Sequence, residues 1–160
     1  MSNRFSRYVG FANKFPIKLR PFALTRLFCS QVRFAGTSGI RILSISATEV
    51  VIVLANKKKV QNHIGGIHAI AAAVLAESAT GIVFAMNVSN SSLPLLKSMN
   101  ISYQRRMQGQ LTAVAQLSVL EAKQIAEQEK GCLVIPIKIT DESGLEPIEC
   151  QMEWAWVSKK

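Results

Sequence analysis

Hydrophobic residues in the last third of the chain recur at every second position, which is the period of a half-buried β-strand. The clearest case is residues 148–156, where Ile, Cys, Met and two Trp residues alternate with Glu and Gln. Residues 133–139 alternate in the same way, and Pro136 on their other face predicts an edge or a bulge. A turn at residues 141–144 separates these two predicted strands.

Further strands are predicted earlier in the chain. Residues 47–55 are rich in Val and Ile and form the first firm strand, within an extended pattern that begins at Ile40. A short apolar run at residues 82–88 predicts another strand. Two strands at 101–107 and 111–119 flank Gln108-Gly109 and predict a hairpin. A short polar helix at 121–130, ended by Gly131, follows them.

Residues 68–80 show no alternation of apolar and polar positions, neither that of a strand nor that of a half-exposed helix. Residues 68–80 present Ala, Ile, Val and Leu on every side, and a helix that is apolar all round is a buried helix. Gly81 is well placed to end it. The order of one strand, one buried helix and then four or five mostly antiparallel strands predicts an α+β fold, in which a sheet wraps around one central helix.

The N-terminal segment has its own helical pattern. Pro21 suits the first turn of a helix whose face carries Leu24, Leu27, Phe28 and Val32, and residues 36–39 are predicted to form a loop. We expect this helix to cover an edge or mouth of the domain, with membrane-surface contact through its basic face as the alternative. The predicted division is an extension over residues 1–39 and a domain over residues 40–160.

Charge is distributed unevenly along the chain. The net charge is +9, yet residues 1–41 hold eight Lys or Arg and no acid, while the remainder holds eleven basic and ten acidic residues. A nucleic-acid partner is therefore not expected, because a binding face would be built into the folded domain. No stretch qualifies as a membrane span, so stable membrane insertion is not expected. We expect a cytoplasmic protein, with a mitochondrial transit peptide as the alternative meaning of the Arg-rich start.

Cysteine and histidine usage argues against a metal site. Cys29, Cys132 and Cys150 are widely separated and odd in number, so neither a disulfide framework nor a zinc motif fits. The two His residues lack paired ligand spacing. Three reduced thiols and no metal or other cofactor are the expectation.

Glu77 is the most informative residue for chemistry. It lies inside the predicted buried helix, in the run Ala-Ala-Ala-Val-Leu-Ala-Glu-Ser-Ala, and no Lys or Arg lies within helical reach. A carboxylate in apolar surroundings costs several kcal/mol unless it is paired, hydrogen-bonded or protonated. Desolvation would raise its pKa, which suits a general base or nucleophile near neutral pH.

The start of the same helix predicts an oxyanion site. In the sequence Asn62-His-Ile-Gly-Gly66-Ile-His68, the glycines permit close approach to a ligand, and a helix start presents free N–H groups. Nine residues separate His68 from Glu77, about 13 Å along a helix. One chain can hardly apply both ends to one carbonyl, whereas two antiparallel helices in a dimer could.

These residues resemble a known family. The pattern of Asn62, five residues, His68, eight residues, then Glu77 followed by Ser78 resembles the hotdog-fold thioesterases of the phenylacetate-pathway type, which carry Asn, His-Gly-Gly, and Asp-Thr at these spacings. The chain from about residue 20 also looks like a branch of that superfamily known only as a domain of unknown function. Shared features are the Asn-His-(any)-Gly-Gly-(any)-His-Ala signature, Ala-Glu at the helix end and a terminal Glu-Trp-(any)-Trp strand.

The resemblance implies a hotdog-fold acyl-coenzyme A thioesterase that acts as a homodimer or a dimer of dimers and needs no cofactor beyond the coenzyme A of its substrate. It implies that Glu77 is base or nucleophile and that Asn62 orients the attacking water or the thioester. Around the oxyanion, Gly66, His68 and the Ala69 amide would form the binding turn, and Ser78 would hydrogen-bond near the leaving group. The chain departs from the family pattern in having Glu77 for Asp and Ala69-Ile70 for Gly-Gly.

Structural roles stay open for each of these residues. Glu77 could instead cap backbone donors across a dimer interface, His68 could only shape the helix start, and Asn62 could only stabilise a turn. Three consecutive lysines precede the site and could attract the phosphates of coenzyme A or form a solvated loop: Lys57, Lys58 and Lys59. At most one of Arg105 and Arg106 is expected to face a ligand groove, and Trp154 and Trp156 are expected in the core or an interface. The alternative function is a non-catalytic hotdog module that binds an acyl chain or acyl-coenzyme A.

Overall fold

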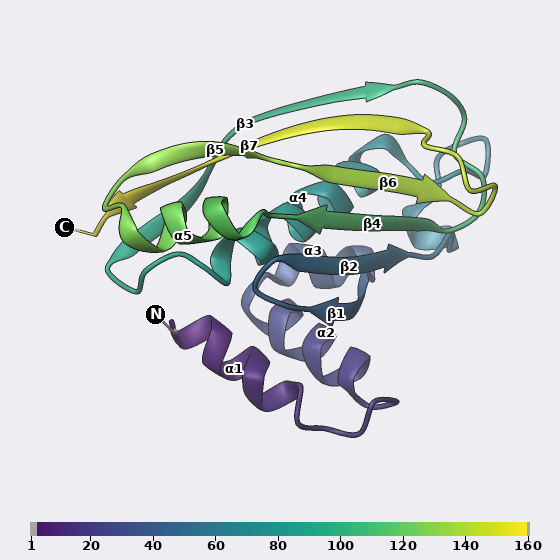
Figure 1. Ribbon diagram of the computed structural model, residues 1–160. Helices are drawn as coiled ribbons and strands as arrows, with labels where there is room; N and C mark the ends of the chain where they lie inside the picture. The colour runs from purple at the N-terminus through teal and green to yellow at the C-terminus, as the bar shows by residue number, and fades with distance from the viewer. Residues whose placement is uncertain (1–2, 160) are drawn as a thin grey trace.

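A computed structural model describes residues 3–159 of the chain. An antiparallel sheet curves around one long helix, and three further helices precede the sheet in the chain (Figure 1). This is the predicted α+β hotdog architecture, and the prediction is confirmed. The N-terminal helices are α1 (Arg4–Ala12), α2 (Arg20–Gln31) and α3 (Arg33–Ser38).

The sheet consists of two hydrogen-bonded groups of strands. One group has the order β1-β2-β4-β6 and the other β3-β7-β5. Their bounds are β1 (Arg41–Ile45), β2 (Glu49–Leu54), β3 (Ser92–Tyr103), β4 (Leu111–Gln116), β5 (Gly131–Ile135), β6 (Ile137–Asp141) and β7 (Ile148–Ser158). Pro136 alone separates β5 from β6, so a single stretch of chain passes from one group to the other. The predicted bulge at Pro136 is thus the point where the sheet divides.

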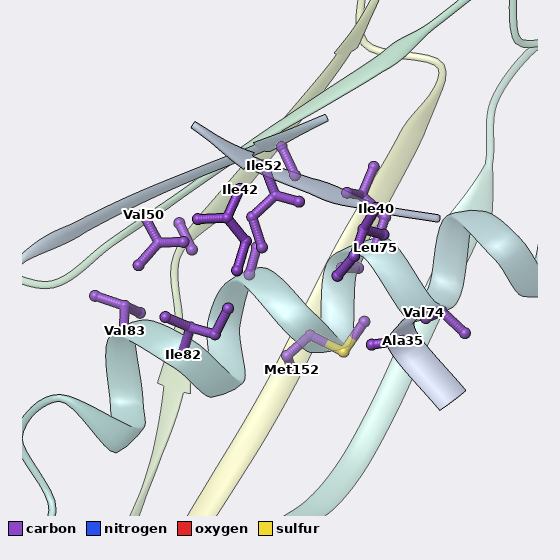
Figure 2. Packing of buried hydrophobic residues seen from close by; sticks show 14 of the residues in the cluster. Ala35, Ile40, Ile42, Val50, Ile52, Val74, Leu75, Ile82, Val83 and Met152 are labelled. Atoms are coloured by element: carbon purple, nitrogen blue, oxygen red, sulfur yellow. The ribbon is translucent and has the colours of Figure 1, made fainter. Parts of the chain in front are cut away.

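The central helix α4 (Ala69–Ala85) forms the middle of the core. Leu75, Ile82 and Val83 of this helix pack against Ile42 and Ile52 of the overlying strands (Figure 2). The strand β7 adds Met152 and Trp156, both fully buried. The predicted alternation of this last strand is confirmed, since Ile148, Met152 and Trp156 all lie inside.

Two predictions about the central helix and its sequel are wrong. Gly81 does not end α4, which continues to Ala85, and residues 82–88 form the last turn of this helix and the turn that follows it instead of a strand. Glycine is needed at position 81 because β7 approaches α4 closely there: a Cβ atom at Gly81 would lie 2.8 Å from the ring of Trp154. Gly81 therefore serves packing between α4 and β7 rather than a left-handed cap.

The predicted hairpin around Gly109 is also wrong. β3 pairs with β7 along its whole length, whereas β4 pairs with β2 and β6. Residues 104–110 therefore cross between the two groups of strands. After β4 the chain forms α5 (Val119–Glu127), which begins two residues earlier than predicted because Ser118 and Glu121 form a capping box. Val119 belongs to this helix and is exposed, not to the apolar face of the strand.

The N-terminal helices cover one edge of the sheet, as predicted for the helix that begins near Pro21. Leu24 of α2 is buried, and the Thr25 hydroxyl accepts a hydrogen bond from the Ile42 amide of β1 at 2.9 Å. Residues 33–38, which include part of the predicted loop, form α3, and Gly39 in the left-handed conformation ends it. No helix within residues 3–159 is long and apolar enough to cross a membrane. The division of the chain at residue 39 stays a prediction.

Candidate active site

One face of α4 carries two of the predicted site residues, Glu77 and Ser78. Val74, Ser78 and Gly81 succeed one another at intervals of four and three residues, so they share a helical face with the adjoining Glu77, while His68 caps the start of the helix. Helix α3 lies along this face, where its Ala35 is close to Val74 (Figure 2). Two neighbouring cavities open beside the face, and both are lined by Phe34 and Val74.

The first cavity has a volume of about 270 Å³ and holds Glu77 at its wall. Its lining is otherwise nearly all apolar, and it is contributed by α2, α3, α4, β3 and β7: Phe28, Val32, Phe34, Ala35, Val74, Ser78, Gly81, Ala85, Pro94 and Trp154. The Trp154 indole N–H donates to the Thr80 hydroxyl at 3.0 Å, which fixes the ring against α4. This space can hold an apolar group next to a carboxylate.

Glu77 itself is half-buried and has no internal partner. No hydrogen bond or ion pair engages its carboxylate within residues 3–159; only its main-chain carbonyl is used, by the Thr80 hydroxyl. Ser78 beside it is buried and lines the same cavity. The structure thus places two of the predicted residues together and leaves the acid free to contact a ligand or water.

The turn before α4 is built around Asn62. The Asn62 side-chain oxygen accepts from the backbone amides of Ile64 and Gly66, both at 3.1 Å, and the Asn62 backbone N–H donates to the Gly66 carbonyl at 2.8 Å. Gly65 has φ of +76°, a conformation that favours glycine. Asn62 Oδ1 is therefore committed to the turn, and so is the Gly66 amide. The Asn62 Nδ2 group has no hydrogen-bond acceptor within residues 3–159.

His68 caps the start of α4 from an exposed position. Its Nδ1 accepts a hydrogen bond from the Ile70 amide at 3.1 Å, so a neutral ring carries its proton on Nε2. The Ala69 amide has no acceptor among the described residues, and it lies at the positive end of the helix dipole. Of the predicted oxyanion donors, Ala69 is the one that the fold leaves available.

Sequence reasoning missed Tyr103 at this helix start. Its hydroxyl donates to the Ala69 carbonyl at 2.8 Å, which ties the end of β3 to the first turn of α4. Burial raises the pKa of this phenol, and the nearby Cys150 adds to the shift, so the tyrosine keeps its proton near neutral pH. A Tyr in an exposed, polar stretch gives no sequence signal for this contact.

The second cavity, of about 250 Å³, adjoins His68 and reaches the lysine cluster. Lys59 lines it, and its ammonium group donates to the Thr37 carbonyl at 3.0 Å. Lys57 and Lys58 are exposed and form no ion pair with any described residue. Two of the three predicted phosphate-binding lysines are thus free, while the third holds α3 against the loop before the site.

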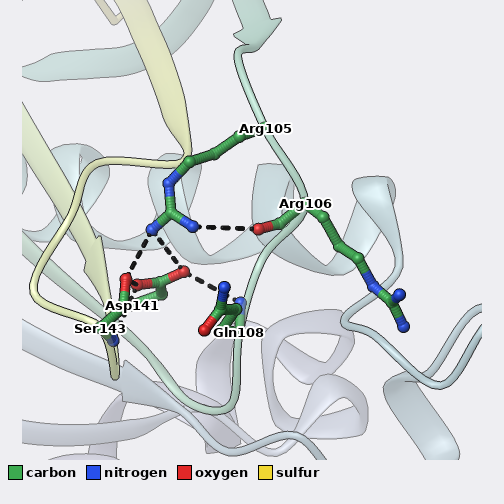
Figure 3. Close-up of polar contacts among 5 residues, drawn as sticks. All are labelled: Arg105, Arg106, Gln108, Asp141 and Ser143. Atoms are coloured by element: carbon green, nitrogen blue, oxygen red, sulfur yellow. Dashed lines mark hydrogen bonds and ion pairs between the residues drawn. The ribbon is translucent and has the colours of Figure 1, made fainter.

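The segment 105–108 supports the Asn62 turn from outside. Arg105 pairs with the enclosed carboxylate of Asp141 at 2.8 Å, whereas Arg106 points the other way and donates to the Ile64 carbonyl at 2.9 Å (Figure 3). The two arginines therefore face opposite sides, as predicted. Burial alone would raise the pKa of Asp141, but hydrogen bonds from Ser143, the Gln108 amide and Arg105 outweigh it and leave that pKa below its ordinary value.

Comparison with known proteins places the chain in a family. Residues 21–157 match the family described as a domain of unknown function, DUF4442. The chain belongs to the DUF4442 family. The resemblance seen in the sequence, to the hotdog thioesterase superfamily and its branch of unknown function, is confirmed. No curated protein matches the DUF4442 chain.

Solved structures extend the comparison. A Pseudomonas aeruginosa protein of unknown function, described as a "Probable Thioesterase", is 25% identical with a TM-score of 0.76, and the match covers 87% of this DUF4442 chain and 97% of that one. A thioesterase from Haemophilus influenzae is 16% identical with a TM-score of 0.68, covering 91% and 92%. A variant of a thioesterase enzyme from Staphylococcus aureus is 22% identical with a TM-score of 0.66, covering 78% and 98%. The last two likenesses concern the fold alone.

Proposed function

We propose that this DUF4442 protein hydrolyses an acyl-coenzyme A thioester. The observation that carries the proposal is the Glu77 carboxylate, which lies without an internal partner in the wall of a mostly apolar cavity. The cavity would take the first part of the acyl chain, and Glu77 would activate water for attack on the thioester carbonyl or attack it directly. The solved thioesterases of the same fold agree with this reaction class.

The negative charge that develops on the carbonyl oxygen would be met at a helix start. The Ala69 amide has no other acceptor and lies at the positive end of α4, and such a donor supplies roughly 3 to 4 kcal/mol of transition-state stabilisation. The Asn62 side-chain NH₂ group is a second free donor nearby in sequence. About 13 Å along the helix separates this start from Glu77 of the same chain, so the donor for a given Glu77 would come from a second subunit.

The edge strand β3 is the surface that would join two subunits. It is 12 residues long, and within residues 3–159 only one of its edges is paired, with β7. Met99 and Tyr103 on its helix-facing side remain 47% and 45% exposed. An exposed edge of this length is a template for pairing. Antiparallel pairing of two β3 strands would reverse the partner's α4, directing its start toward the Glu77 end of the first helix.

The test is acyl-coenzyme A hydrolysis followed by thiol release, with acyl chains of short, medium and long length and an aryl acyl group. We expect turnover with at least one chain, and Glu77→Gln should lower kcat roughly 100-fold or more because the amide can act neither as base nor as nucleophile. Glu127→Gln, on the exposed face of α5, is the matched control and should retain full activity.

Two results would count against the proposal. Wild-type protein that turns over none of the substrates would leave the alternative, a non-catalytic module that binds acyl-coenzyme A, and calorimetry would then detect binding without hydrolysis. Full activity in a folded Glu77→Gln variant would remove Glu77 from the chemistry. Sedimentation at the assay concentration would show whether the active species is larger than one chain.

A further inference from the structure

Helices α1 and α2 present an apolar surface to the outside of the molecule. Six exposed side chains on these helices and the loop between them make up this surface, called here the hairpin surface: Tyr8, Phe11, Phe15, Ile17, Leu19 and Phe22. Five of them line a shallow apolar groove of about 520 Å³, and only Ile17 lies outside it. Phe11, Ile17 and Phe22 remain 64%, 75% and 73% exposed, which is unusual for clustered large apolar residues.

The outward direction of these side chains is fixed by the opposite face of α1. Val9 and Ala12 are buried in the core, and the Asn3 side chain donates to the Ala85 and Val88 carbonyls at the end of α4, both at 2.7 Å. Helix α1 is therefore docked on the domain with its aromatic face turned away. The hairpin surface lies at the end of the molecule remote from β3 (Figure 1).

Basic residues are interspersed with those of the hairpin surface along the chain, and no acid balances them. The segment 1–48 contains eight Lys or Arg and no Asp or Glu. Within the described part of that segment, no basic side chain forms an ion pair; one guanidinium, that of Arg20, donates to the Phe15 carbonyl. Arg7, Lys14 and Lys18 are exposed and directly adjoin residues of the hairpin surface in the sequence, and Arg26 lines the groove itself. Aromatic and aliphatic side chains interspersed with exposed cations match the two layers of an anionic membrane surface.

We infer that the hairpin surface docks this protein onto an anionic phospholipid bilayer. The apolar tip at residues 15–19 would enter the boundary between headgroups and acyl chains, and the cations would contact lipid phosphates. A second copy fits less well, because it would bring the same unbalanced positive charge to the contact. Single-stranded nucleic acid would stack on flat aromatic platforms, whereas the tip is formed partly by the aliphatic Ile17 and Leu19.

The experiment is co-sedimentation of the full-length protein with phosphatidylcholine vesicles, with and without about 30% phosphatidylglycerol. We expect binding to the anionic vesicles that weakens steeply between about 50 and about 500 mM NaCl. The triple variant Arg7→Gln/Lys14→Gln/Lys18→Gln should bind roughly 100-fold more weakly, at about 1 kcal/mol for each cation. Phe11→Ser/Phe22→Ser should weaken binding at least tenfold at every salt concentration.

Matched controls use the exposed helix α5 and the residues that follow it. Val119→Ser/Leu120→Ser removes two equally exposed apolar side chains from α5, and Lys123→Gln/Lys130→Gln removes two cations; both variants should bind vesicles like the wild type. Equal sedimentation with neutral and anionic vesicles, or with neither, would overturn the inference. So would binding to single-stranded DNA that exceeds vesicle binding, or self-association that disappears in Phe11→Ser/Phe22→Ser. Thioester hydrolysis in solution does not enter any of these readouts.

Discussion

Replacing Asp141 by Asn should be the most destabilising conservative change near the site. The carboxylate is fully enclosed, and its two oxygens each accept two hydrogen bonds. Oδ1 accepts from the hydroxyl and the amide of Ser143, while Oδ2 accepts from Arg105 and from the Gln108 amide. In either orientation, an Asn NH₂ group would face two donors, and Arg105 would lose its counter-charge.

The magnitude follows from these four bonds. Two hydrogen bonds to a charged acceptor are lost, at roughly 1.5 to 3 kcal/mol each, and breaking a buried ion pair typically costs about 3 to 5 kcal/mol. We expect the free energy of unfolding to fall by about 3 to 5 kcal/mol, or Tm by roughly 6 to 20 °C for a chain of this size. Arg106, the residue after Arg105, donates a hydrogen bond to the Ile64 carbonyl, so loss of the Arg105 ion pair should also loosen the turn around Asn62.

Urea unfolding followed by the fluorescence of Trp154 and Trp156 measures this loss. Since the pKa of Asp141 is lowered in the folded state, its stabilisation is complete above the unfolded value of about 4 and is lost as pH falls through the folded value. The difference between wild type and Asp141→Asn should therefore be full at pH 7 and shrink below about pH 4. Glu146→Gln, which breaks an exposed pair with Lys138, should change stability by less than about 0.5 kcal/mol. A loss below 1 kcal/mol at pH 7 for Asp141→Asn would refute the reasoning.

Three further changes are predicted from single contacts. Gly81→Ala should lower unfolding stability by about 1 to 2 kcal/mol despite the better helix propensity of Ala, because the added methyl group meets the Trp154 ring; an unchanged urea midpoint would contradict this. Titration of native thiols with dithionitrobenzoate at pH 8 should show a fast reaction at the exposed Cys132, absent in Cys132→Ser, and a slow one at Cys150, whose pKa burial raises to about 11. Ser118→Ala should cost about 1 kcal/mol by removing the cap of α5, measured by the same urea unfolding.

The sequence predicted those elements whose pattern is decided locally. The alternation of β7 and the all-round apolar character of α4 both follow from burial, and together they were enough for the fold. Gly81 was misread because its neighbour, Trp154, lies 73 residues away in the chain, and no local rule distinguishes a packing glycine from a cap. The prediction of a hairpin at Gly109 was wrong for a related reason, since β3 pairs with β7, a strand far away in the sequence.

The candidate site was predicted in part. The spacing of Asn62, His68 and Glu77 identified a turn and a helix beside two neighbouring cavities, with His68 in the wall of one and Glu77 in the wall of the other; Asn62 lines neither. The role of Phe34, which lines both cavities, was not predicted. Phe34 belongs to α3, a helix of six residues that was predicted partly as loop. The commitment of Asn62 Oδ1 to its own turn also depends on hydrogen-bond geometry that residue types alone do not specify.

Helices α1 and α2 cover the outer edge of β1, and this limits how copies of the protein can add to one another to form filaments. The Thr25 hydroxyl accepts from the Ile42 amide, and the Asn13 side chain donates to the Ile45 carbonyl at 3.3 Å. These two backbone groups of β1 are therefore not available to pair with the strand of another molecule. When a copy adds at β3 and presents its own β3, the pairing edges of both chains are used and this growth stops at two. The N-terminal helices would in this way protect a protein with a long open strand from endless stacking in a crowded cell.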